Sequence, residues 1–185
     1  MTLQPRLHNI DDTESWKQYL DTHGFVVIQD ILTREEMTQG LDLFKQDMNQ
    51  ISPTFKLEDP TTFCIENTPL MFGKGMAVYN GWGQSDFMWH VRTNPKIKSI
   101  YQKIYDTDDL VVSLDGFSLF VSNKQKSPSW LHIDQNPKNK IYSVQGSYNY
   151  LPVTESDAGF VVIPQSHLTY KPEVEHSKDW IMVDN

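Results

Sequence analysis

The sequence predicts a mainly β fold, a β-sandwich of the jelly-roll type with flanking helices packed outside it. Two observations support this prediction. Apolar residues with helical spacing occupy the first third of the chain, and strand-like patterns follow one another after Asp109. Helices first and antiparallel strands later are typical of two packed sheets with helices around them. With 185 residues, the chain is expected to form a single domain, residues 1–185, with a sizeable core.

Residues 1–50 are expected to form helices around one short strand. A first helix is predicted to end at Gly24, because glycine is the residue that most often terminates a helix. The apolar run at 25–28 predicts a short buried strand. Thr33 and Glu36 have the spacing of a capping box, which predicts the start of a second helix.

The middle of the chain changes character twice. Prolines and glycines punctuate residues 52–90, and we expect a lid-like loop region there. Asn94 followed by Pro95 predicts the start of another helix. Jelly-roll strands are then expected over 110–167, the longest being the alternating segment 141–153.

An H-x-D triplet, formed by His132 and Asp134 around Ile133, is the main candidate site. Residues two apart on a strand project from the same face. An imidazole and a carboxylate placed in this way are two of the three ligands of the facial triad that holds Fe(II). The alternative is a structural role, because a histidine on a strand is often hydrogen-bonded in the core.

Three further residues are candidates. His167 is a candidate third ligand that would close a cupin-like metal site, and the alternative is a histidine in a surface turn. Gln145 and Asn149 belong to a row of uncharged polar residues on the expected strand 141–153. If that row points inward, a bound cofactor or substrate would satisfy its hydrogen bonds. The alternative is that the row faces solvent, as one side of an antiparallel sheet can.

Composition excludes several classes of protein. A net charge of −8 argues against binding to nucleic acid or to an anionic membrane. Cys64 is the only cysteine, so an internal disulfide is excluded and a reducing compartment fits best. No apolar stretch has the features of a signal peptide or the length of a membrane span. The expectation is a cytoplasmic protein that acts on a small-molecule substrate.

Several segments together resemble the phytanoyl-CoA dioxygenase family of Fe(II)/2-oxoglutarate oxygenases. Residues 23–33 resemble the opening segment of that family, 130–135 its metal-binding strand, and 143–146 with 159–167 the segments that follow. The order and spacing of these pieces are more specific than any one of them. The resemblance implies a double-stranded β-helix that binds Fe(II) through His132, Asp134 and a distal histidine. It also implies 2-oxoglutarate as the co-substrate in hydroxylation of a small molecule.

The sequence departs from the family pattern in two ways. Gln165 stands where the family has a glycine, and no arginine follows His132 to pair with the far carboxylate of 2-oxoglutarate. The expectation is therefore a jelly roll that is incomplete at its C-terminal end. The alternatives are a catalytically inactive fragment, a non-catalytic jelly-roll binding module, or a sheet and site completed by a second chain.

Overall fold

The computed structural model describes residues 5–72, 75–121, 131–135, 141–157, 159–169 and 181–182. Contacts divide the chain into two compact units, each built from segments that are separated in the sequence. Unit 1 comprises Met1–His8, Glu14–Val27 and Gln125–Asn185, and unit 2 comprises Asn9–Thr13 and Ile28–Lys124. This division does not test the prediction of one domain, which stays a prediction.

Unit 1 contains most of helix α1, Thr13–His23, whose buried side chains are Trp16 and Leu20. Its strands are short. β1, Leu7–His8, pairs with β2, Val27–Ile28, and β5, His132–Ile133, pairs antiparallel with β6, Ile181–Met182. A single helical turn, α5, covers Ser166–Thr169.

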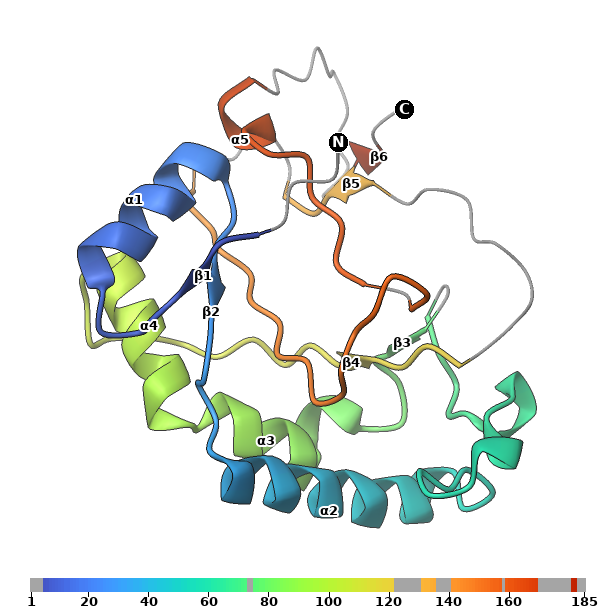
Figure 1. The fold of residues 1–185 in the computed structure, drawn as a ribbon. Helices are drawn as coiled ribbons and strands as arrows, with labels where there is room; N and C mark the ends of the chain where they lie inside the picture. The colour runs from blue at the N-terminus through green and yellow to red at the C-terminus, as the bar shows by residue number, and fades with distance from the viewer. Residues whose placement is uncertain are drawn as a thin grey trace. The chain divides into compact units, whose positions relative to one another are not determined.

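Unit 2 is mainly helical. It contains α2, Arg34–Ile51, α3, Asp86–Arg92, and α4, Pro95–Tyr105, and α3 packs against α2 (Figure 1). The predicted loop region 52–90 forms the short turns η1, Pro60–Thr62, η2, Ile65–Asn67, and η3, Trp82–Gln84, together with strand β3, Met76–Ala77, and the start of α3. Strand β3 pairs antiparallel with β4, Phe117–Ser118.

The core of unit 2 is a cluster of aromatic rings. The ring of Phe44, from α2, lies 5.2 Å from that of Phe87 and 5.5 Å from that of Phe117, between ring centroids. Trp82 is fully buried, and its ring lies 4.7 Å from the ring of Phe117 in an edge-to-face arrangement. Such aromatic pairs bury much apolar area and prefer tilted geometries. This cluster joins α2, α3, η3 and β4 into one core.

The prediction of a mainly β jelly roll is wrong. Every strand among the described residues is two residues long, and the strands form three separate two-stranded sheets. Within 110–121, the described strand β4 pairs with β3 and not with a neighbouring segment of the predicted strands. The described residues of 141–153 and 159–163 contain no strand.

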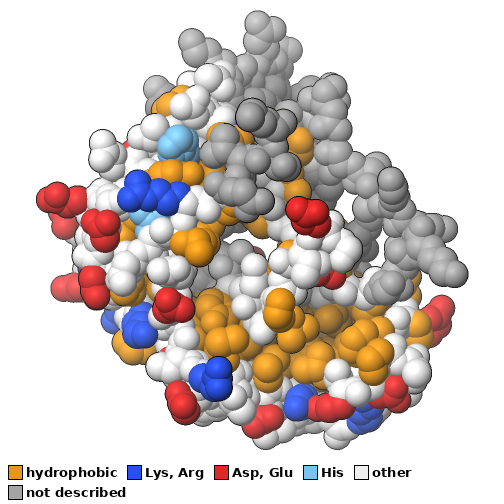
Figure 2. Space-filling view, viewed as in Figure 1, with side chains coloured by type: hydrophobic (Ala, Val, Ile, Leu, Met, Phe, Trp, Pro, Cys, Tyr) orange, Lys and Arg blue, Asp and Glu red, His pale blue; other side chains and the backbone are white. Residues whose placement is uncertain are grey.

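The alternating pattern was misleading because it reports on a single segment and carries no information about which strand lies beside it. It favours extended backbone, but a strand also needs a neighbouring strand that accepts its hydrogen bonds. The described parts of 110–114, 141–153 and 159–163 pair with no strand, and apolar side chains on them are exposed to solvent. Val111 is 97% exposed and Phe160 is 80% exposed. Figure 2 shows hydrophobic side chains gathered on the visible face of the molecule.

Among the described residues, no helix is both long and apolar enough to cross a membrane.

The predicted starts of α2 and α4 are confirmed. Thr33 and Glu36 form a reciprocal capping box at the start of α2, with the Thr33 amide donating to Glu36 Oε2 at 2.7 Å. Asn94 caps α4, and its Nδ2 donates to Glu36 Oε1 at 3.0 Å. Hydrogen bonds lower the pKa of Glu36, chiefly the bond from the backbone of Thr33. One carboxylate therefore connects the N-terminal ends of two helices.

Replacing Glu36 by alanine is expected to lower the free energy of unfolding by about 1–2 kcal/mol, because the cap is lost and Asn94, which is 5% exposed, loses a partner. Since folding lowers the pKa of Glu36, this advantage of the wild type is present above the unfolded-state pKa of Glu36. It is lost as the pH falls through the lower pKa of the folded state. Urea unfolding at several pH values measures both effects. Glu35→Ala, in the same helical turn, is the control, and an equal loss in both variants would contradict the prediction.

Candidate functional site

The structure brings His132 and Asp134 together. His132 lies on β5, and Asp134 follows the end of that strand. The Nε2 atom of His132 lies 2.8 Å from Oδ1 of Asp134. The two side chains are 25% and 51% exposed, so a solute can reach both. The spacing of two residues therefore places an imidazole and a carboxylate side by side, as the H-x-D triplet predicts.

Gln145 contacts the same carboxylate from the other side. Its Nε2 donates to Oδ2 of Asp134 at 2.8 Å. Each oxygen of Asp134 therefore has a nitrogen neighbour, His132 at Oδ1 and Gln145 at Oδ2. Asn149 is exposed, as is Gln145, but the side-chain amide that donates to the carboxylate is that of Gln145. The row of polar residues that the sequence places on one strand lies on an extended segment that faces solvent.

The pair fits two positions of a metal site. Two donors that each lie about 2.1 Å from a metal, at right angles to each other, are about 3.0 Å apart. The separation of 2.8 Å between His132 Nε2 and Asp134 Oδ1 is close to this value. Coordination would require Nε2 without its hydrogen. Among the described residues, no three His, Cys, Asp or Glu side chains are grouped closely enough to hold a metal, so these residues do not supply a third ligand.

His167 belongs to α5 and contacts the C-terminal end of α1. Among the described residues, it does not form a possible metal group with His132 and Asp134. Its Nε2 lies 2.8 Å from the backbone oxygen of Asp21, so Nε2 carries the hydrogen and donates it. The amide of Gln165 donates to the backbone oxygen of His23 at 2.9 Å. Two carbonyls in the last turn of α1 therefore receive donors from the segment around α5, which satisfies groups that helix ends leave open.

Arg92 is a structural residue that the sequence does not reveal as one. Its guanidinium donates to the backbone oxygens of Gly83 and Asp115, and burial lowers its pKa while the Asp115 carboxylate opposes that effect. His90 is also structural, with Nε2 2.8 Å from the backbone oxygen of Glu36. Backbone oxygens have no signature in sequence, which is why the partners of Arg92 could not be read from it.

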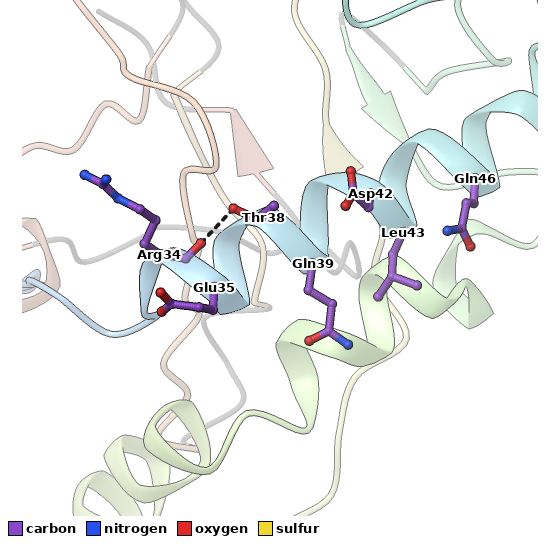
Figure 3. Close-up of a pocket in the computed structure, with 7 residues that line it drawn as sticks. All are labelled: Arg34, Glu35, Thr38, Gln39, Asp42, Leu43 and Gln46. Carbon is purple, nitrogen blue, oxygen red and sulfur yellow. Dashed lines mark hydrogen bonds between the residues drawn. The ribbon is translucent and has the colours of Figure 1, made fainter.

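A shallow hollow of about 600 Å³ lies along α2 (Figure 3). Its lining side chains all come from this one helix: Arg34, Glu35, Thr38, Gln39, Asp42, Leu43 and Gln46. They follow successive turns of α2, and none of the lining residues comes from a second element. Binding sites for small molecules usually enclose their ligand between several elements. The hollow is therefore a surface feature of α2, and the carboxylate of Asp134 remains the candidate site.

Two curated proteins are similar to the chain. One is "Ava biosynthesis cluster protein O" of Aspergillus versicolor, 27% identical over 149 residues, which are 79% of this chain and 48% of the relative. Another is "Putative phytanoyl-CoA dioxygenase" of Dictyostelium discoideum, 24% identical over 131 residues, which are 66% of this chain and 37% of the relative. The chain thus spans less than half the length of these relatives. No family model matches it, and no solved structure matches it at a significant level.

Proposed function

We propose that the chain carries the metal-binding pair of a non-haem Fe(II)/2-oxoglutarate-dependent dioxygenase that hydroxylates a small molecule. The observation that carries this proposal is the approach of His132 Nε2 to Asp134 Oδ1 at 2.8 Å. Similarity to a protein named as a phytanoyl-CoA dioxygenase supports the same class. A reducing, cytoplasmic setting is part of the proposal, because Cys64 is the only cysteine of the chain.

The two side chains have different roles in this proposal. His132 supplies a neutral nitrogen, and Asp134 supplies an oxygen whose negative charge offsets part of the charge of the cation. Both are reachable from solvent, so a metal ion can enter without unfolding of the site. Bound Fe(II) would supply chelation of 2-oxoglutarate and activation of oxygen. Among the described residues, only His132 and Asp134 would hold the metal in this proposal.

An anaerobic titration of the purified chain with Fe(II), with and without 2-oxoglutarate, tests the proposal. We expect a weak visible charge-transfer absorption when both are present and none when either is missing. His167→Ala is expected to keep this absorption, because His167 lies at the end of α1.

Two outcomes would reject the proposal. If Fe(II) does not bind, the chain has no metal site of its own and is a non-catalytic module. If Fe(II) binds but 2-oxoglutarate produces no absorption, the chain binds a metal without being an oxygenase of this class.

A further inference from the structure

We propose that Gln145 is a positioning residue that holds the Asp134 carboxylate in the orientation needed for metal coordination. This inference rests on the proposed function and names a residue that serves the same site. Gln145 lies eleven positions after Asp134, outside the H-x-D triplet, and its side-chain amide reaches Oδ2 at 2.8 Å.

The two carboxylate oxygens of Asp134 have different partners. Oδ1 faces His132 Nε2, and Oδ2 accepts the hydrogen bond of Gln145. If His132 Nε2 and Oδ1 were to hold a metal ion, the hydrogen bond from Gln145 to Oδ2 would not be in competition with them. Gln145 would therefore leave Oδ1 as the oxygen available to hold a metal, because Oδ2 already accepts its hydrogen bond.

The exposure of Asp134 explains why such a partner matters. The side chain is 51% exposed and follows the end of a two-residue strand, so packing does little to fix it. The terminal torsion of an aspartate has a broad preference, and an unrestrained carboxylate would rotate. A bond from Gln145 reduces this freedom before the metal arrives, so less ordering accompanies binding.

An amide is suited to this role because it is neutral. A lysine at the same place would form an ion pair with Asp134 and weaken the attraction between the carboxylate and a cation. A leucine has a similar size but donates no hydrogen bond. Gln145→Leu therefore removes the bond and keeps most of the volume. Asn149→Leu is a matched control, because Asn149 is an exposed amide on the same segment and is not the amide that donates to Asp134.

The experiment measures Mn(II) binding to the full chain by the loss of the free-ion electron paramagnetic resonance signal. We expect Gln145→Leu to bind Mn(II) roughly ten- to a hundredfold more weakly than the wild type, the usual effect of losing a residue that orients a ligand. Asn149→Leu is expected to bind like the wild type. In the metal-free protein, nuclear Overhauser effects are expected between the side-chain amide of Gln145 and the β-protons of Asp134.

The outcomes separate this inference from the proposed function. If the wild type binds Mn(II) and Gln145→Leu binds it equally well, the role of Gln145 is overturned while the metal pair stands. Missing Overhauser effects in the folded, metal-free protein would overturn it as well. If the wild type binds no Mn(II), the proposed function itself fails, and a positioning role for metal binding fails with it.

Discussion

Alanine in place of His132 or Asp134 is expected to weaken binding of Mn(II) or Fe(II) by more than about a hundredfold. Loss of a residue that only orients a ligand costs roughly ten- to a hundredfold in metal affinity, so loss of a ligand itself should cost more. The two atoms concerned, His132 Nε2 and Asp134 Oδ1, are 2.8 Å apart and would share one metal ion. Isothermal titration under anaerobic conditions measures the change in affinity.

Asp134 can contribute to metal affinity through its negative charge and through the position of its oxygen, and a second substitution tells the two contributions apart. Asp134→Asn keeps the shape of the side chain and an oxygen, but it removes the negative charge, so we expect an affinity between those of the wild type and Asp134→Ala. Glu155→Ala is the control, because it removes one exposed negative charge from the same unit. Equal weakening by Glu155→Ala would show a general electrostatic effect, and unchanged binding by Asp134→Ala would show that the metal lies elsewhere.

The second large effect is expected at Gly24, the residue that ends α1. Its φ angle is +79°, and a Cβ added there would meet the ring of His167 at Nδ1. Alanine in this left-handed conformation costs roughly 1–2 kcal/mol. Displacement of the ring would also remove the bond from His167 to the Asp21 carbonyl, at a cost of about 1 kcal/mol. Gly24→Ala is therefore expected to lower the free energy of unfolding by about 2–3 kcal/mol, measured by urea unfolding.

A double-mutant cycle separates the two contributions. In a chain that already carries His167→Ala, Gly24→Ala should cost only its conformational part, about 1 kcal/mol less than in the wild type. Gly81→Ala is a matched control, because Gly81 has a φ of +78° and no heavy atom within 4 Å of an added Cβ. If the costs at Gly24 are the same with and without His167, the ring does not constrain that position.

Local features of this chain could be predicted from sequence, and non-local ones could not. The caps at Thr33 and Asn94 depend on residues two or three positions away, so their spacing was sufficient. The contact of His132 with Asp134 depends on a separation of two residues, so it could also be predicted from the sequence. Strand partners are different, because nothing within 110–121 indicates that β4 pairs with β3. The same limit hid the contacts of Gln145 and Arg92.

The attachment of His167 to α1 has a consequence for the order in which the chain folds. The carbonyl of Asp21 and the imidazole that donates to it are separated by 146 positions. During synthesis, the continuous segment Ile28–Lys124 of unit 2 is complete before the donors for the last turn of α1 exist. An isolated helix of eleven residues is marginally stable in water. We therefore expect α1, which is made before this segment of unit 2 and before α5, to become stable only after them.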